Sequence, residues 1–205
     1  METSLKTDPD FREIIEYEKH AAPEHSHRGK TTESFLDKKA VLSALGVQRG
    51  QTVLDAGCGG GYMSRVFSEL VGPEGRVYAL DSDEQSLAAL KTQTAGTNMI
   101  VVVGDITVNT GLLSSSFDLI YLSNVVHGFN PRQIPGFREE VTRLLAPGGR
   151  LAVVEIVKRA TPFGPPMEQR VSPEELRSLL GLLPLSTHDA GEYFYVQLLG
   201  KSGDR

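Results

Sequence analysis

The residues best suited to chemistry in this chain form a glycine-rich stretch, residues 53–62, which reads Val-Leu-Asp-Ala-Gly-Cys-Gly-Gly-Gly-Tyr. Its apolar start is typical of a strand, and a helical pattern follows the glycines. Glycine lets the backbone turn sharply and approach a ligand because it has no Cβ, and a helix that begins there points its free N–H groups at the ligand. The stretch therefore predicts a site for a nucleotide-like cofactor.

Acidic residues at the ends of three predicted strands restrict the chemistry of that cofactor. Asp55, Asp81 and Asp105 each stand at the end of an apolar run, and a carboxylate repels a phosphate that binds at a helix N-terminus. The dinucleotide motif Gly-x-Gly-x-x-Gly is also incomplete, because Tyr62 occupies its third glycine position. The pattern therefore favours a cofactor that carries a ribose and a positive charge but no phosphate.

These residues must be positioned by a fold in which strands and helices alternate. Short apolar runs predict the strands, and apolar residues at helical spacing predict the helices. We expect strands at residues 52–56, 76–81, 99–104, 117–123, 150–157 and 193–199, and helices at residues 35–45, 62–71, 85–94, 135–145 and 173–180. The alternation predicts a doubly wound, Rossmann-like α/β fold, in which ligands bind beyond the carboxyl ends of the strands.

Length and composition predict one domain and argue against several kinds of partner. With 205 residues, 40% of them hydrophobic, the chain can bury one substantial core, so residues 1–205 are expected to form a single domain. The polar residues 1–33 are expected to form an N-terminal lid or cap over the site. A net charge of −5 with scattered basic residues disfavours a nucleic acid partner. A single cysteine and the lack of a long apolar run predict a cytoplasmic protein without membrane insertion.

Taken together, these motifs resemble those of the class I S-adenosylmethionine-dependent methyltransferases. The resemblance is greatest to the small-molecule type typified by the C-methyltransferases of ubiquinone and menaquinone biosynthesis. It rests on five markers in the family's order, namely residues 53–61, Asp81, residues 104–106, residues 117–120 and residues 145–150. It implies a seven-stranded sheet whose last strand is antiparallel, S-adenosylmethionine as the cofactor and S-adenosylhomocysteine as the product.

The resemblance implies which residues hold the methionine end of the cofactor. The backbone of Gly57 and Gly59 would contact the methionine part, and Asp55 would support the turn and the ammonium group. Ser123 and Asn124, at the end of the fourth strand, would lie close to the sulfonium through their carbonyl groups. The alternative for Asp55 is a carboxylate at a strand end that caps the next helix.

The resemblance also implies which residues hold the adenosine end. Asp81, with Ser82 beside it, would bind the ribose hydroxyls, because a carboxylate can accept hydrogen bonds from both hydroxyls at once. Asp105 would accept a hydrogen bond from the adenine amino group, and Ile106 would pack on the ring. The alternative for Asp81 is an N-cap for the helix near Gln85, and the alternative for Asp105 is a local turn.

Two residues near the ends of later strands are candidates for a catalytic base. His127 follows the fourth strand and titrates near neutral pH, although it could instead hold a loop by hydrogen bonding. Glu155 lies in the apolar run of residues 151–156, where an unpaired carboxylate would be costly. We therefore expect Glu155 to be paired, to lie at a strand end or to be functional.

The acceptor pocket is expected to involve the segment before the first predicted strand and the loop after the fifth. In the enzymes that the chain resembles, the segment before the first strand folds over the cofactor, which makes Tyr17, His27 and Arg28 candidates, Tyr17 as a further catalytic residue. Met167 lies in a proline-rich loop that would form another wall. No metal site is predicted, because spacing marks no third and fourth ligand beside His25 and His27.

The sequence thus predicts an S-adenosylmethionine-dependent methyltransferase that transfers a methyl group to a small molecule by direct in-line displacement. Three alternatives stay open: a methyltransferase that acts on a protein side chain, an NAD-dependent oxidoreductase and a non-catalytic module that binds the cofactor. Nucleic acid methylation is disfavoured by the charge and by the sequence of residues 123–127, which lacks the motif of such enzymes. The identity of the acceptor and the oligomeric state are not predicted.

Overall fold

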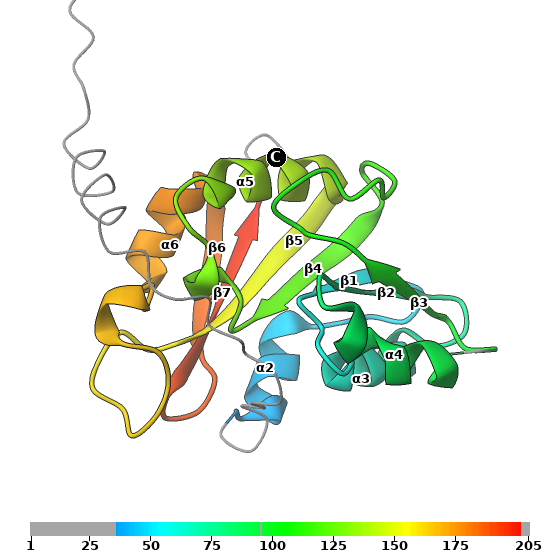
Figure 1. Cartoon of the computed structure of the whole chain (residues 1–205), viewed down its shortest axis with the longest axis horizontal. Coiled ribbons are helices and arrows are strands. Elements are labelled where there is room, and N and C mark those ends of the chain that lie inside the picture. Colours follow the sequence, from blue (N-terminus) through cyan, green and yellow to red (C-terminus); the bar gives the residue numbers. More distant parts are fainter. Residues whose placement is uncertain (1–35, 95, 202–205) are drawn as a thin grey trace, which may run out of the picture. The chain divides into compact units, whose positions relative to one another are not determined.

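A seven-stranded sheet forms the centre of the computed structural model, which describes residues 36–94 and 96–201 (Figure 1). The predicted lid therefore lies outside the described residues, together with Tyr17, His27 and Arg28. The strands are β1 (Thr52–Ala56), β2 (Arg76–Asp81), β3 (Met99–Val103), β4 (Phe117–Ser123), β5 (Leu145–Ile156), β6 (Leu183–Asp189) and β7 (Phe194–Gly200). Their order in the sheet is β3-β2-β1-β4-β5-β7-β6.

The direction of the strands confirms the predicted fold class. Strands β3, β2, β1, β4 and β5 pair in parallel with their neighbours, and β7 is antiparallel to both β5 and β6. The strand order reverses between β1 and β4, as in doubly wound α/β folds. The fold is therefore Rossmann-like, mostly parallel, with an antiparallel last strand.

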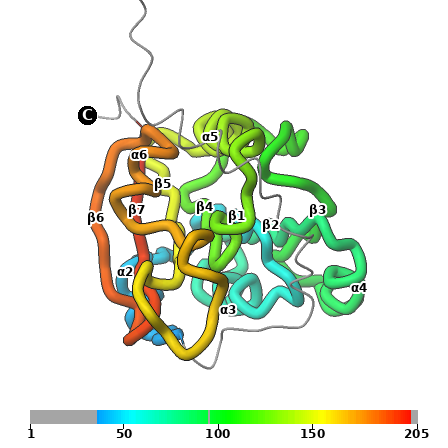
Figure 2. The backbone as a smooth tube through the Cα atoms, turned by 60° about the vertical axis from the view of Figure 1, so that its left-hand side comes forward, coloured from blue at the N-terminus to red at the C-terminus, as the bar shows by residue number. Residues whose placement is uncertain are grey.

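Helices cover both faces of the sheet (Figures 1 and 2). On one face, α2 (Lys38–Leu45) and α3 (Tyr62–Val71) share a core cluster with residues of the central strands, and α4 (Glu84–Gln93) packs beside them on β2 and β3. On the other face, α5 (Gln133–Leu144) and α6 (Pro173–Leu180) share a second cluster. Because both faces are buried, the central strands read as continuous apolar runs.

Two parts of the sheet differ from the prediction, each for a physical reason. Strand β5 begins at Leu145 instead of residue 150, because its pairing with β4 continues across the Pro-Gly-Gly segment through an irregularity in register. Strand β6 was not predicted at residues 183–189. It is an edge strand that pairs only with β7 and is largely exposed, so it has no apolar pattern to reveal it.

Candidate functional site

The predicted cofactor residues lie at the carboxyl ends of β3, β2, β1 and β4. Strands β1 and β4 are neighbours, and the chain leaves them toward opposite sides, which is the switch point where ligands bind in this class of fold. The fold brings the glycine turn after β1 next to residues 123–125 after β4, and it brings Asp81 to the other side of the turn.

The glycine turn, residues 57–61, connects β1 to α3 and needs glycine for two reasons. Gly57, Gly59 and Gly61 have φ values of 75°, 52° and 75°, which other residues rarely adopt. A Cβ at Gly57 would lie 2.5 Å from Val125 Cγ2, and one at Gly61 would lie 2.5 Å from Leu90 Cδ2. Beside Gly59, by contrast, nothing lies within 4 Å of the Cβ position. The turn is thus packed against the protein at both ends and open in its middle.

Asp81 fixes the open middle of the turn. Its Oδ2 accepts a hydrogen bond from the Gly59 N–H at 2.8 Å, and its Oδ1 accepts one from the Asp83 N–H at 2.8 Å. The N-cap of α4 is Asp83, so the alternative that Asp81 caps this helix is wrong. Each carboxylate oxygen can accept a second hydrogen bond, which leaves the predicted ribose role chemically available. Exposed Ser82 lies between the two aspartates.

Asp55 is buried beneath the turn, with 3% of its surface exposed. Its Oδ2 accepts a hydrogen bond from the Ser64 hydroxyl in the first turn of α3, at 2.5 Å. Burial raises the pKa of Asp55 to about 7, against the effect of the Ser64 hydrogen bond and with a further contribution from the negative charge of Asp81. A cation beside this carboxyl would favour its ionised form, so the position is suited to a positively charged ligand.

The residues predicted for adenine lie after β3. Oδ1 of Asp105 accepts hydrogen bonds from the N–H and the hydroxyl of Thr107, at 2.8 and 2.7 Å, so the local turn foreseen as an alternative is present. Both bonds use the same oxygen, and among the described residues no hydrogen bond ends on Oδ2. Ile106 is buried in the core cluster that also contains Phe137. The role of both residues toward adenine stays a prediction.

The end of β4 turns back toward the glycine turn through an unusual backbone conformation. Asn124 has a φ of 56°, a left-handed conformation that asparagine adopts more readily than most residues. Its N–H donates to the Val154 carbonyl at 2.9 Å, and its side-chain amide donates to the Ser123 hydroxyl at 3.2 Å. This turn lets Val125 pack against Gly57, so residues 123–125 and the glycine turn form one continuous surface.

His127 and Glu155, which were predicted separately as candidate bases, form a buried pair. Nδ1 of His127 lies 2.7 Å from Oε2 of Glu155, and the His127 N–H donates to Oε1 at 3.2 Å. The side chains are 6% and 1% exposed. Burial by itself lowers the pKa of His127, but the hydrogen bond and charge of Glu155 outweigh it and hold the pKa above its usual value. Sequence reasoning foresaw that Glu155 needed a partner but did not identify His127.

The loop after β5 is held by a buried arginine that the sequence analysis missed. Arg170 donates hydrogen bonds to the carbonyl groups of Pro165, Val157, Arg159 and Phe163, at distances of 2.6–3.2 Å. Met167, predicted for the acceptor pocket, lies in this loop at the short helix η3 (Met167–Gln169) and is exposed. The signal in the sequence is indirect: a proline-rich loop has few backbone N–H donors, so its carbonyl groups need a side-chain donor such as Arg170.

The described residues contain neither a cluster of metal ligands nor a membrane-spanning helix. In residues 36–94 and 96–201, no three His, Cys, Asp or Glu side chains lie close enough together to hold a metal ion. In the same part of the chain, no helix has the length and apolar character that crossing a bilayer requires.

The sequence is similar to known methyltransferases. Residues 53–149 match the family model of a methyltransferase domain. The demethylmenaquinone methyltransferase of Staphylococcus epidermidis is 32% identical over 129 residues, which cover 62% of this chain and 52% of that protein. The protein of the same name from Staphylococcus aureus is 30% identical over 128 residues, or 61% of this chain and 51% of that one. This chain therefore spans about half the length of the curated relatives that it matches.

Solved methyltransferase structures share the fold. A SAM-dependent methyltransferase from Aquifex aeolicus has a TM-score of 0.72 at 24% identity, with 91% of this chain and 97% of that chain covered. The 1,6-didemethyltoxoflavin-N1-methyltransferase of Burkholderia thailandensis, solved with 1,6-didemethyltoxoflavin and S-adenosylhomocysteine bound, has a TM-score of 0.65 at 20% identity, with 98% and 93% covered. At these identities, the likeness is one of fold.

Proposed function

We propose that this chain is a class I S-adenosylmethionine-dependent methyltransferase that transfers the methyl group of S-adenosylmethionine to a small-molecule acceptor by direct in-line displacement. The observation that carries the proposal is the arrangement at the switch point. There, a glycine turn with an open middle lies over a buried carboxyl, Asp55, and beside a second carboxyl, Asp81. Such a site suits a ligand that is cationic at one end and carries hydroxyl groups at the other.

The residues present suit the methionine and ribose parts of this cofactor. Asp55 would face the positively charged methionine end, where its raised pKa makes it ready to ionise beside a cation. Asp81 is already oriented by two backbone N–H groups, which hold its carboxylate in place for the ribose hydroxyls. Bound S-adenosylmethionine supplies an electrophilic methyl group and a neutral leaving group, so the protein has only to align the acceptor and exclude water.

The His127–Glu155 pair would manage the proton of the acceptor. Glu155 binds Nδ1 of the imidazole and thereby fixes the orientation of the ring. The carboxylate also stabilises the imidazolium that forms when His127 accepts a proton. The pair lies after β4 and near the end of β5, at the same edge of the sheet as the cofactor residues. This arrangement favours an acceptor that carries an acidic proton, such as a phenol or a quinol.

Cofactor binding is tested by isothermal titration calorimetry of the full chain with S-adenosylhomocysteine and with NAD. We expect S-adenosylhomocysteine to bind and NAD to give no heat. Asp81→Asn should weaken S-adenosylhomocysteine binding, whereas Glu69→Gln, a substitution at the far end of α3, serves as a control without effect. Binding of NAD without any response to S-adenosylhomocysteine would contradict the proposal and favour an oxidoreductase.

The class of acceptor is tested with S-adenosylmethionine that carries a tritiated methyl group. Two similar proteins are named for demethylmenaquinone, so a reduced naphthoquinone is the first acceptor to try, followed by catechols and other phenols. We expect label in a small organic product. Label in protein but not in any small molecule would support methylation of a protein side chain, and cofactor binding without transfer to either would support a non-catalytic module.

The proposal extends to the remaining parts of the chain and to its location. Residues 1–33 would close over the bound cofactor as part of the same domain, bringing Tyr17, His27 and Arg28 to the acceptor, with Met167 on the opposite wall. Hydrogen–deuterium exchange with and without S-adenosylhomocysteine tests this, because closure would protect amides in residues 1–33. A cytoplasmic location would suit the single cysteine, and cell fractionation would check it.

A further inference from the structure

The connection between β3 and β4, residues 104–116, is a long segment without regular secondary structure. It begins with the residues predicted for adenine, Asp105 and Ile106. An irregular segment of this length has few backbone hydrogen bonds of its own, so another element must hold it in one conformation. That element is α5.

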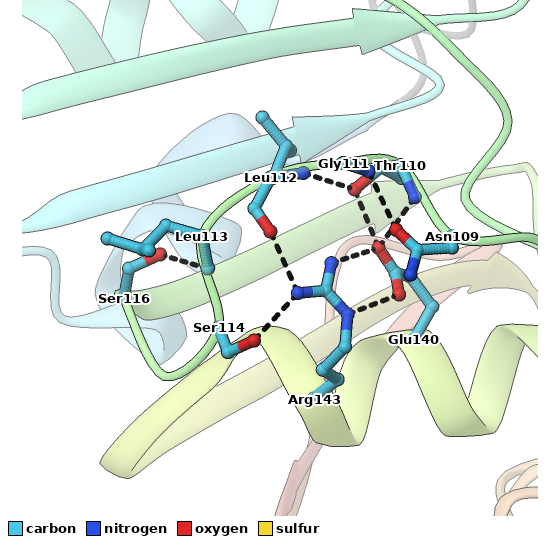
Figure 3. Close-up of polar contacts among 9 residues, drawn as sticks. All are labelled: Asn109, Thr110, Gly111, Leu112, Leu113, Ser114, Ser116, Glu140 and Arg143. Atoms are coloured by element: carbon cyan, nitrogen blue, oxygen red, sulfur yellow. Dashed lines mark hydrogen bonds and ion pairs between the residues drawn. The ribbon is translucent and has the colours of Figure 1, made fainter.

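An ion pair on α5, between buried Glu140 and partly exposed Arg143, holds the middle of the β3–β4 connection (Figure 3). Glu140 is 3% exposed, and its Oε1 accepts hydrogen bonds from the N–H and the hydroxyl of Thr110, at 2.9 and 2.6 Å. Arg143 donates to both oxygens of Glu140, at 2.8 and 2.7 Å, and through Nη1 to the Leu112 carbonyl and the Ser114 hydroxyl, each at 2.8 Å. One helical pair thus binds three residues of the connection.

The charge of Glu140 is retained in spite of its burial. Desolvation alone would raise the pKa of this carboxyl, but the hydrogen bonds from Arg143 and Thr110 together lower it below the usual value. The carboxylate therefore accepts every hydrogen bond as an anion, and charge-assisted bonds of this kind are shorter and more directional than neutral ones. Figure 3 shows the guanidinium lying between Glu140 and the backbone of residues 112–114.

The same helix also holds the two ends of the connection. A Cβ on Gly136 would lie 2.1 Å from the Thr107 carbonyl oxygen, so α5 approaches the backbone directly after Ile106 as closely as glycine allows. At the far end, the N–H groups of Ser115 and Ser116 donate to carbonyl groups in the last turn of α5. Thr107 in turn orients the Asp105 carboxylate through two hydrogen bonds to Oδ1. A continuous series of contacts therefore joins Glu140 to Asp105.

We propose that Glu140 and Arg143 are positioning residues for the adenine end of the cofactor site, acting through the β3–β4 connection on Asp105 and Ile106. The proposal rests on the function proposed above. The hydrogen bonds of the pair go to Thr110, Leu112 and Ser114, so its effect on Asp105 and Ile106 is indirect. It fixes where Oδ2 of Asp105 points, and hence how well the site distinguishes an adenine amino group from another substituent.

The test compares two ligands in titration calorimetry of the full chain. S-adenosylhomocysteine carries the adenine amino group, whereas S-inosylhomocysteine carries an oxygen at that position and is otherwise the same. The wild-type chain should prefer S-adenosylhomocysteine. In Glu140→Gln, which keeps the size of the side chain but not its charge, Kd for S-adenosylhomocysteine should rise about tenfold, the scale of one lost hydrogen bond, while Kd for S-inosylhomocysteine changes little.

A matched control is available on α6. Glu174 pairs with Arg177 at the same spacing of three residues but is exposed and far from the connection in sequence, so Glu174→Gln should leave both affinities unchanged. If Glu140→Gln does not fold, Thr110→Val replaces it. This substitution removes the hydroxyl that donates to Glu140 and accepts from the Leu112 N–H, keeps the ion pair and should reduce the preference in the same direction.

The outcomes separate this inference from the proposed function. If the wild-type chain binds neither ligand, the proposed function is wrong and this inference with it. If the wild-type chain binds S-adenosylhomocysteine and folded variants keep its preference over S-inosylhomocysteine, the inference alone is wrong. An equal loss of affinity for both ligands would also overturn it, because a general loosening of the site would not act on the adenine amino group.

Discussion

Replacing Glu155 by glutamine tests whether the buried pair with His127 is an ion pair. Glutamine keeps the shape of the side chain, and its oxygen can still accept from the His127 N–H. The charge that holds the His127 pKa above 6.5 is lost, so burial and the positive charge of Arg170, which both lower this pKa, remain. We therefore expect the pKa of His127 in Glu155→Gln to fall below its usual value, and the imidazole to be neutral at physiological pH.

The magnitude follows from the 2.7 Å contact between Nδ1 and Oε2. A hydrogen bond between charged groups contributes about 1.5–3 kcal/mol. In the wild type, the folded pKa of His127 is raised, so its contribution to stability is present below 6.5 and is lost as the pH rises through the folded pKa. In the variant the sign is reversed, because a neutral buried imidazole loses stability as the pH falls. The variant should therefore be destabilised by about 1.5–3 kcal/mol more at about pH 6 than at about pH 9.

Urea denaturation at these two pH values, followed by circular dichroism, measures the difference, and NMR titration of the imidazole protons reports the pKa directly. Glu168→Gln, an exposed residue in the loop after β5, is the control and should not change with pH relative to the wild type. An equal loss of stability at both pH values would refute the ion pair and leave only a hydrogen bond of fixed strength.

Three further substitutions test the switch point and the core beneath it. Gly57→Ala should lower the free energy of unfolding by about 1–3 kcal/mol, because φ is 75° and the new Cβ would meet Val125. Gly60→Ala is the control and should not lower it, because the space around Gly60 is open. Thermal unfolding of both variants measures the difference, and equal melting temperatures would contradict the packing argument. Asp55→Asn should remove a pH dependence of the free energy of unfolding, because a pKa of about 7 makes the wild type lose stability as the pH rises from 3.8 toward about 7. Urea denaturation across this range should give stability profiles of the wild type and the variant that diverge. Parallel profiles would count against a buried carboxyl with a raised pKa. Tyr121→Phe should leave stability unchanged or raise it by up to about 1 kcal/mol, because the buried hydroxyl has no hydrogen-bond partner among the described residues; a clear loss in guanidinium denaturation would show that this hydroxyl is satisfied.

The central elements could be predicted from sequence because their patterns are local. Strands β1, β2 and β4 and helix α3 have the predicted bounds. A strand that is buried on both faces is apolar throughout, and the apolar residues of an amphipathic helix recur every three or four positions. Helix α6 also has its predicted bounds, because Ser172, Pro173 and Gly181 mark its two ends through a capping box and a left-handed C-cap.

The interactions between distant segments could not be predicted in this way. His127 and Glu155 are 28 residues apart, and nothing in either local sequence identifies the other as its partner. The ion pair of Glu140 and Arg143 reads in sequence as an ordinary exposed pair on a helix, because its burial depends on the connection that folds over it. Edge strand β6 has no apolar pattern, because it pairs only with β7 and its side chains are largely exposed.

The position of β7 has a consequence for how the protein is made. This strand is the last of the seven in sequence, yet it lies between β5 and β6 and is buried along its whole length. While the ribosome is still synthesising residues 194–200, β5 and β6 cannot pair with each other in the native order, and each presents an open edge. Translation must therefore pass residue 200 before the sheet can close, and a nascent chain that stalls earlier exposes two strand edges to chaperones or to other chains.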